Sequence, residues 1–376
     1  MTGLAPNEWL SGSLQAQHDL VGRLAVLRAS PDLDRHHSEL SFATLSGVLR
    51  RSPPLVDPDV FSAGWDILAR RYTMLGLRRL LPMERVWVGT SSSQATGFGG
   101  FHYPNQGYRH LQMAAVITLY GDLTGNWTRS PQISALDLLR SYAHDCLHFG
   151  TYRRYRLWNT STGDEIGRVQ YGINFRKNDG RTYSAPDRAS DRSTRNLGIV
   201  MEGATDREAR MVARHAAQRE GVPHPDTLGT DYFAFRDETG LLDGTDLSAL
   251  EDPLQRTALA DQPDAEKFLT NMTDYARGVG TRYDSFLREI GREEAGDLHQ
   301  LVLTSMISGS LAQLSDWLNQ RHGPAAFVTI FKSPAYCGRY RGEGPKRSTA
   351  CATASFNVYP AESGSRTPVV IAGETV

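Results

Sequence analysis

The chain has little cysteine and no long hydrophobic run. Its 376 residues include three cysteines, Cys146, Cys337 and Cys351. So small and odd a set is not the disulfide framework of a small secreted domain, although Cys337 and Cys351 are able to pair in an oxidising compartment. No apolar stretch approaches the roughly 20 residues that span a bilayer, and the N-terminus lacks the pattern of a signal peptide. These absences predict a cytoplasmic protein with no membrane partner.

An excess of either charge is also missing. The chain has 41 basic and 42 acidic residues, for a formal net charge of -1. Nucleic-acid-binding proteins carry a basic surface, so no nucleic-acid partner is expected. The composition, 40% hydrophobic and 22% charged, is ordinary for a globular protein with a sizeable core. A peptide or protein substrate is the expected kind of partner.

Hydrophobic periodicity predicts an α+β fold in three consecutive regions. Residues 1–82 form a helical N-terminal region, because apolar residues recur at helical spacing over 14–28 and 60–81. Residues 83–222 combine a strand layer with two helices. Residues 223–376 form a mostly helical region with a terminal β segment.

Within the middle region, strands are predicted at 84–92 and 113–122. A helix is then predicted through 135–156, with either Ser134 or Pro131 at its start. A hairpin with its turn at 178–180 and a polar loop at 187–196 lead to a second helix at 198–220.

The C-terminal region begins with an Asp-, Gly- and Pro-rich connection over 222–264, expected to be irregular. Helices are predicted at 265–279 and 283–291, followed by one long apolar helix at 298–321. The two strand candidates of the tail are 327–331 and 355–360.

Two histidines one helical turn apart form the most informative motif. His144 and His148 enclose Asp145, Cys146 and Leu147 in a segment predicted to be helical. Side chains at positions i and i+4 share one helix face, and imidazole binds zinc at about 2.0–2.1 Å. The alternative is a pair of partly buried histidines that hydrogen-bond to other groups.

An acidic pair lies on the second helix. Glu202 and Asp206 also stand four residues apart and share a face. A catalytic zinc commonly takes three protein ligands, and Glu202 can supply the third. Asp206 can orient the ring of a ligating histidine. The alternative is an acidic first turn stabilised by the helix dipole.

The segments HDCLH and EGATD together resemble the gluzincin class of zinc metallopeptidases. Its thermolysin-like members carry HExxH on one helix and ExxxD on the next, and the similarity covers about residues 113–220. The resemblance implies a zincin-like core in which His144, His148 and Glu202 bind Zn²⁺. It further implies that Asp206 supports the first histidine, and that the strand before the first helix lines the substrate cleft.

Two departures from the gluzincin pattern stand out. Asp145 replaces the glutamate that activates water, and an aspartate is one methylene shorter, a loss of roughly 1.5 Å of reach. Residues 149–201 are a longer connection than in thermolysin, so the predicted hairpin and polar loop would be an insertion.

The expected activity is a zinc-dependent metallopeptidase. Zinc lowers the pKa of its water from 15.7 to about 7, and Asp145 accepts the proton as hydroxide attacks a peptide carbonyl. The oxyanion needs a further donor, for which Tyr171 and His224 are the leading candidates, with Tyr183 and His215 as alternatives.

Two other functions stay open. The substitution at Asp145 favours a metal-binding or interaction protein that keeps a peptidase fold without cleaving peptides. Two histidines and one carboxylate are also the ligand set of iron enzymes, so a metal-dependent biosynthetic enzyme is the third possibility. Cys146 is expected in the core rather than as a nucleophile, and the basic cluster Arg153, Arg154 and Arg156 is expected on a solvated face.

Overall fold

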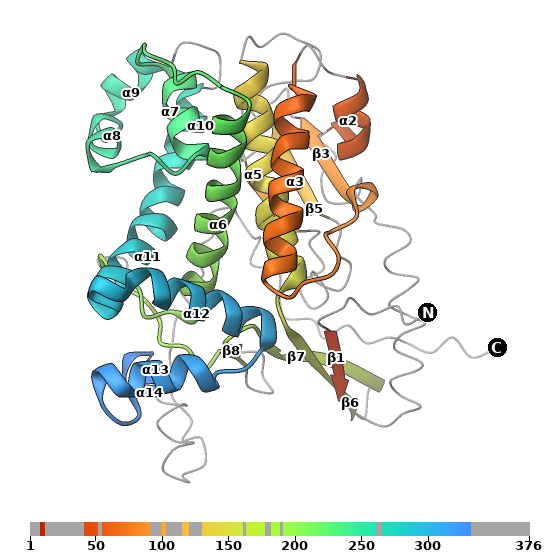
Figure 1. The fold of residues 1–376 in the computed structure, drawn as a ribbon, viewed down its shortest axis with the longest axis vertical. Coiled ribbons are helices and arrows are strands. Elements are labelled where there is room, and N and C mark those ends of the chain that lie inside the picture. Colours follow the sequence, from red (N-terminus) through yellow and green to blue (C-terminus); the bar gives the residue numbers. More distant parts are fainter. Residues whose placement is uncertain are drawn as a thin grey trace, which may run out of the picture. The chain divides into compact units, whose positions relative to one another are not determined.

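The computed structural model describes residues 8–11, 41–51, 55–90, 99–102, 115–119, 130–160, 163–176, 182–188, 191–260 and 265–331. Helices predominate among these residues and strands form two small sheets, as expected for the α+β class (Figure 1).

Contacts divide the chain into unit 1 (residues 1–26, 150–204 and 278–376) and unit 2 (residues 27–149 and 205–277). Both units are discontinuous in sequence, whereas the sequence suggested three consecutive regions.

Unit 2 contains a mixed sheet with the strand order β2-β3-β5-β4. β2 (Ser41–Thr44) and β4 (Gly99–His102) are antiparallel to their neighbours, and β3 (Val86–Thr90) is parallel to β5 (Ala115–Leu119). β3 and β5 confirm the strands expected at 84–92 and 113–122. β5 is the strand expected to line the substrate cleft. It lies between β3 and β4, so its backbone groups are already paired and a substrate peptide cannot add to the sheet alongside it.

Three short or medium helices accompany this sheet: α2 (Leu45–Arg51), α3 (Pro58–Met74) and the 3₁₀ turn η1 (Met83–Arg85). α3 begins where the Asp57 carboxylate accepts the backbone N–H groups of Asp59 and Val60, a typical N-cap. The helix ends before residue 81, the end expected from the sequence, because Gly76 adopts a positive φ of 77°.

The long helix α5 (Pro131–Gly150) is packed tightly against α3. A Cβ atom at Gly64 would lie 2.0 Å from Leu139 Cδ2, so only glycine permits this approach of the two helices. The Tyr72 hydroxyl donates to the Cys146 carbonyl at 2.8 Å, and the Tyr142 hydroxyl donates to the Leu81 carbonyl at 2.7 Å. These contacts fix α5 in the core of unit 2.

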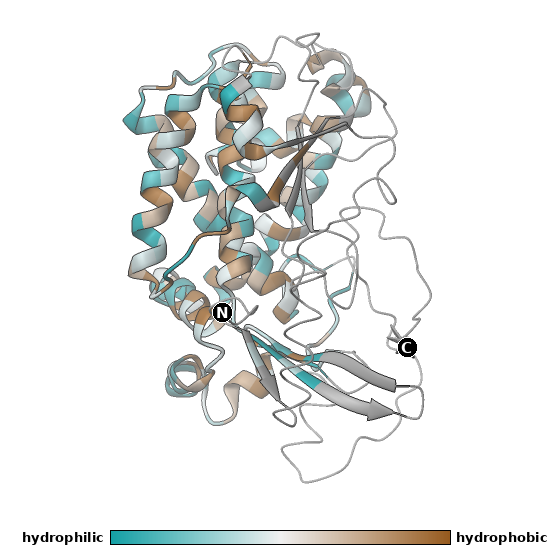
Figure 2. Cartoon of the chain, turned by 90° about the vertical axis from the view of Figure 1, so that its right-hand side faces the viewer, coloured by the Kyte–Doolittle hydropathy of each residue, from teal (hydrophilic) through white to brown (hydrophobic). Residues whose placement is uncertain are grey.

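The second long helix, α6 (Leu197–Arg219), confirms the helix predicted at 198–220. Gly221, with φ 64°, follows its end. The division between the two units falls between Ala204 and Thr205, so α6 is one continuous helix that contributes to both. Along the helices, hydrophobic and hydrophilic residues alternate as expected for amphipathic helices (Figure 2).

The prediction of an irregular connection over 222–264 is wrong. This segment forms α7 (Thr230–Glu238), α8 (Gly244–Ala249) and α9 (Pro253–Leu259). Residues that suggested a loop are in fact helix caps. Asp243 and Asp246 form a capping box, and Asp252 caps α9 directly before Pro253.

The predicted helices at 265–279 and 283–291 are present with interruptions. α10 (Ala265–Tyr275) continues as a π turn, η2 (Ala276–Gly280), and α11 (Thr281–Phe286) continues as a second one, η3 (Leu287–Gly291). A 3₁₀ turn, η4 (Arg292–Glu294), follows.

Two predictions for the C-terminal region are wrong. The single helix expected at 298–321 is two helices, α12 (Ala295–Ser308) and α13 (Ala312–His322), because Gly309 takes the left-handed conformation and ends the first. Most of the segment 327–331, a strand candidate, lies in helix α14 (Ala326–Ile330), so tertiary packing overrides its β propensity. The strand candidate at 355–360 lies outside the described residues.

Unit 1 contains the sheet β1-β6-β7-β8. β1 (Glu8–Ser11) is parallel to β6 (Arg153–Thr160), and β7 (Gly163–Tyr171) is antiparallel to both β6 and β8 (Asn174–Phe175). Because β6 begins at Arg153, the helix that carries His144, predicted to continue to residue 156, ends at Gly150. Arg176 and Thr182 form an isolated antiparallel bridge, and the expected turn at 178–180 lies outside the described residues.

The described part of residues 1–82 contains two short strands, β1 and β2, besides helices α2 and α3. The predicted helix at 14–28 lies outside the described residues. The basic cluster was expected on a solvated face. This holds for Arg154 and Arg156, which are exposed, but is wrong for Arg153, which is fully buried. Alternation of side chains along β6 accounts for this difference.

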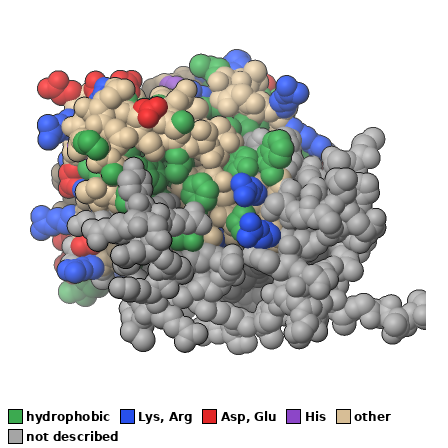
Figure 3. Space-filling model, turned by 90° about the horizontal axis from the view of Figure 1, so that it is seen from below, with side chains coloured by type: hydrophobic (Ala, Val, Ile, Leu, Met, Phe, Trp, Pro, Cys, Tyr) green, Lys and Arg blue, Asp and Glu red, His purple; other side chains and the backbone are tan. Residues whose placement is uncertain are grey.

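The described surface carries both signs of charge, and acidic and basic side chains are interspersed along one edge of the face drawn in Figure 3. In the described part of the chain, the helices are all too short or too polar to cross a lipid bilayer.

Candidate metal centre

The histidine pair lies near the C-terminal end of α5. His144 and His148 are one turn apart, and their ring centroids are 4.5 Å from each other with the planes inclined by 70°. His148 is buried and His144 is partly exposed. The helix therefore presents two imidazoles side by side, as the spacing predicted.

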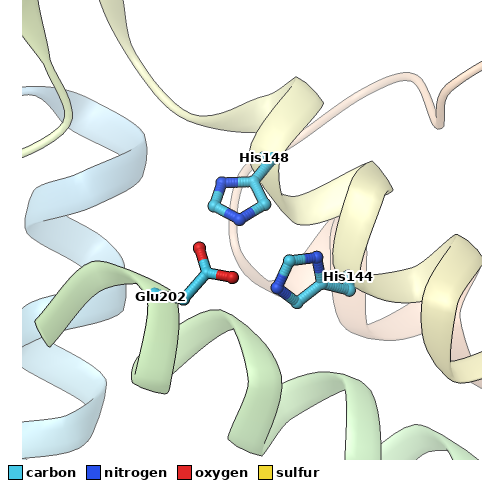
Figure 4. A group of neighbouring side chains, drawn as sticks. All are labelled: His144, His148 and Glu202. Carbon is cyan, nitrogen blue, oxygen red and sulfur yellow. The ribbon is translucent and has the colours of Figure 1, made fainter. Parts of the chain in front are cut away.

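Glu202 completes a group of three potential metal ligands. Its carboxylate faces a ring nitrogen of each histidine across the space between α5 and α6 (Figure 4). The two helices are held in register by Arg140 of α5, whose Nη2 lies 3.7 Å from Asp206 Oδ1 on α6. Since α6 is continuous, Glu202 lies one turn before Asp206 and on the same face.

The spacing of these ligand atoms suits a small cation. One atom from each of His144, His148 and Glu202 lies within 4.8 Å of the others. Ligands at about 2.0–2.1 Å in a tetrahedral zinc site are about 3.3–3.4 Å apart. The side chains thus need to close by at most about 1.5 Å, which side-chain rotation can provide. The group can hold a metal ion.

Asp145 lies beside this group. Its side chain is buried, and Asp145 Oδ1 is 3.8 Å from His144 Nδ1. A buried carboxylate next to a histidine ligand is in the region where a general base would act. Cys146, in contrast, is a buried free thiol, and burial raises its pKa above the ordinary range, as expected for a core residue rather than a nucleophile.

Asp206 is more strongly held by arginines than by a histidine. Arg210 Nε donates to Asp206 Oδ2 at 2.6 Å, and Arg140 approaches the other oxygen. Burial alone would raise the pKa of Asp206, but Arg210, Arg140 and then His144 lower it below its usual value. The carboxylate is thus charged and near His144, while its charged partners are the two guanidinium groups.

Tyr171, the last residue of β7, is brought close to Glu202. Burial raises the pKa of Tyr171 to about 12, the positive charges of Arg153 and Arg168 oppose this rise, and the Glu202 carboxylate adds to it. Arg168 Cζ lies 4.8 Å from the centre of the tyrosine ring. At neutral pH the hydroxyl is therefore protonated and able to donate.

His224 is not brought to the metal group. It follows the C-terminal end of α6, where it is exposed, and its ring packs on Tyr232 and Phe235. The N–H of Val222 bonds to Ala217, and the rise of α6 from Glu202 to Ala217 is about 22 Å. His215 is exposed on the same distant part of α6. Tyr183 lies in the segment after β8, where its N–H bonds to Phe175.

The sequence analysis did not identify a buried ionic network that involves the same two helices, α5 and α6. Its members come from α5, α6 and the end of α7, and they are Arg140, Asp206, Arg210, Asp237 and Glu238, with the buried carboxylate of Asp137 acting on Glu238. Arg140 Nε lies 3.2 Å from Glu238 Oε2. The signal that sequence offered was Arg140 one turn before His144 and Arg210 one turn after Asp206, but the α7 partners lie in the segment predicted as irregular.

Close packing beside Glu202 also escaped prediction. A Cβ atom at Gly203 would lie 2.4 Å from Tyr283 Cβ, so glycine alone allows α6 to approach α11. The Tyr283 hydroxyl and His299 Nδ1 are 2.8 Å apart and buried. Tyr283 is therefore held by His299 and packs against Gly203, the residue after Glu202 on α6.

Glu238 makes the stability of the protein depend on pH. Burial raises the pKa of Glu238 to about 8, Arg140 opposes this rise, and the nearby Asp137 carboxylate adds to it. Because the folded state binds the proton more tightly than the unfolded state, this contribution to stability is complete below the unfolded pKa of about 4.3 and is lost as pH rises through 8.

We expect the melting temperature of wild type to fall between pH 5.5 and 8.5 by several degrees more than that of Glu238→Gln. Calorimetry or circular dichroism over this range measures the difference. Glu251→Gln, which removes an exposed carboxylate, serves as the control and should keep the wild-type slope. Equal slopes in wild type and Glu238→Gln would show that Glu238 does not take up a proton on folding.

Comparison with known proteins gives no relative. No protein-family model, curated protein sequence or solved structure matches the chain. A function for the chain is therefore inferred from the metal-binding group and its surroundings.

Proposed function

We propose that the chain is a zinc-dependent hydrolase, most closely a metallopeptidase, with His144, His148 and Glu202 as the metal ligands. The observation that supports this is the convergence of two imidazoles and one carboxylate from α5 and α6. Three protein ligands leave one coordination position for water or substrate, as in catalytic zinc sites. When bound there, zinc supplies a Lewis acid that polarises a carbonyl and makes a water molecule more acidic.

The side chains around the ligands have chemically distinct roles in this proposal. Asp145 is the general base, which takes a proton from water and passes it to the leaving amine. Tyr171, protonated and close to Glu202, donates a hydrogen bond to the oxyanion that forms at the substrate carbonyl. His224 has no part in this arrangement, because it lies beyond the opposite end of α6.

A second candidate is a metal-binding protein that does not cleave peptides. Asp145 favours it, since its carboxylate is 3.8 Å from the neighbouring His144 ring and one methylene shorter than the glutamate of gluzincins. A third is an iron enzyme with the same two-histidine, one-carboxylate ligand set.

Metal content and hydrolysis of a mixed peptide library test these candidates together. We expect the purified protein to contain about one zinc per chain by elemental analysis, and mass spectrometry to detect cleavage that a chelator abolishes and added Zn²⁺ restores. Zinc without any cleavage would instead support the second candidate. Iron as the bound metal would support the third, and a metal-free protein would contradict all three.

A further inference from the structure

We infer that Arg210 is a positioning residue of the metal centre, which holds Asp206 beside His144 and couples this carboxylate to helix α7. The inference rests on the metal site proposed above and deepens it, because it names a residue outside the ligand set that governs metal affinity. Arg210 lies one turn beyond Asp206 on α6, two turns from Glu202.

The guanidinium of Arg210 bridges two carboxylates. Its Nε donates to Asp206 Oδ2 at 2.6 Å, and its Nη1 donates to Asp237 Oδ1 at 2.8 Å and to the Asp237 backbone carbonyl. Arg140 faces the second oxygen of Asp206 from α5. Each oxygen of Asp206 therefore faces a guanidinium, and this fixes the orientation of the carboxylate.

Burial makes this orientation important. The side chains of Asp206 and Asp237 are 3% and 5% exposed. In such surroundings a charged hydrogen bond is strong, and a buried carboxylate that loses its partner is costly. A fixed, charged Asp206 favours one ring position and one tautomer of the nearby His144, which prepares it for the metal.

Helix α7 takes part because Asp237 is its next-to-last residue. The same guanidinium thus docks α7 and orients Asp206. Metal affinity is therefore expected to depend on α7 being in place, although none of the three ligands belongs to it.

The test is the zinc affinity of the full-length Arg210→Lys variant, measured by competition with a chelating dye. An ammonium group is a compact point charge that cannot serve two carboxylates in the fixed, planar geometry of a guanidinium. We expect a loss of affinity of about tenfold or more, in the range found for partners of metal ligands. Circular dichroism verifies that the variant is folded.

Arg214→Lys is the matched control. Arg214 lies one turn further along α6 and also docks the end of α7, but its Nε and Nη2 donate to the backbone carbonyls of Thr239 and Gly240 instead of to a carboxylate. Its zinc affinity should stay within about twofold of wild type. Equal losses in the two variants would overturn the inference, since docking of α7 alone would then explain them.

A double-mutant cycle separates the role of Arg210 from general damage. If Arg210 acts through Asp206, then Asp206→Asn combined with Arg210→Lys loses no more zinc affinity than Asp206→Asn alone. Additive losses would overturn the inference. If Arg210→Lys does not fold, Asp237→Asn tests the same link from α7, with the same loss expected and wild-type affinity as the contradicting result.

The same measurements distinguish this inference from the proposed function. A wild-type chain that binds no zinc overturns the metal site itself. If His148→Ala abolishes zinc binding but the losses of Asp206→Asn and Arg210→Lys are additive, the metal site is supported. Only the role of Arg210 is then overturned.

Discussion

Replacing His148 with alanine is expected to reduce zinc affinity by roughly 100- to 1000-fold and to leave the purified protein almost free of metal. A complete four-ligand zinc site provides about 10–16 kcal/mol, so one ligand accounts for about 2.5–4 kcal/mol. His148 is buried beside His144, and the remaining two ligands do not enclose an ion. Elemental analysis and chelator competition measure both effects.

His215→Ala is the control for this prediction. His215 is exposed on α6, on the part of the helix remote from Glu202, so its loss should not change the zinc content. If His148→Ala keeps a full complement of zinc, the metal is bound elsewhere and the proposed centre is wrong. The metal-free variant should also melt at a lower temperature than the zinc-bound wild type, because a ligand that binds only the folded state stabilises it.

Replacing Asp145 with asparagine is expected to lower the rate of peptide hydrolysis by about 10²–10⁴-fold while zinc stays bound. An amide has nearly the shape of a carboxylate but cannot accept the proton from water, and general bases contribute rate factors of this size. The comparison of kcat with metal content in the same sample is essential, since Asp145 lies next to the ligand His144. A loss of zinc in proportion to the loss of activity would assign Asp145 to the support of His144 instead.

Two further variants sharpen this result. Asp231→Asn changes a partly buried carboxylate that accepts the Ser130 N–H just before α5, and it should leave kcat within about threefold of wild type. Asp145→Glu should lower kcat, because the extra methylene moves the carboxylate by roughly 1.5 Å in a site built around the shorter acid. A rise in kcat would identify a site that has lost its longer base, and would favour the metal-binding protein without turnover.

The parts of the site that sequence predicted are those fixed within single helices. The spacing of His144 and His148, and that of Glu202 and Asp206, places each pair on one helix face whatever the rest of the chain does. Apolar periodicity also predicted both long helices, although it extended the first to residue 156, beyond its end at Gly150.

The wrong predictions concern segments whose secondary structure local sequence patterns did not determine. Asp243, Asp252 and Pro253 have the composition of a loop, yet they cap short helices, because the same side-chain oxygens that favour turns also accept helix N-terminal N–H groups. Gly309 interrupts an apolar stretch that periodicity alone reads as one helix. Phe327 lies in a β-prone run that folds as a helix, which shows that tertiary context can override β propensity.

The sequence by itself determined which residues are chemically able to bind a metal and how each pair is spaced along its own helix, because helical geometry is a property of the local backbone. The tertiary structure decided that α5 and α6 bring these pairs to one another, that His224 lies beyond the far end of α6, and that Arg210 links Asp206 to α7. Such contacts join residues far apart in the chain, and they depend on the packing of whole helices, which glycines such as Gly64 and Gly203 permit.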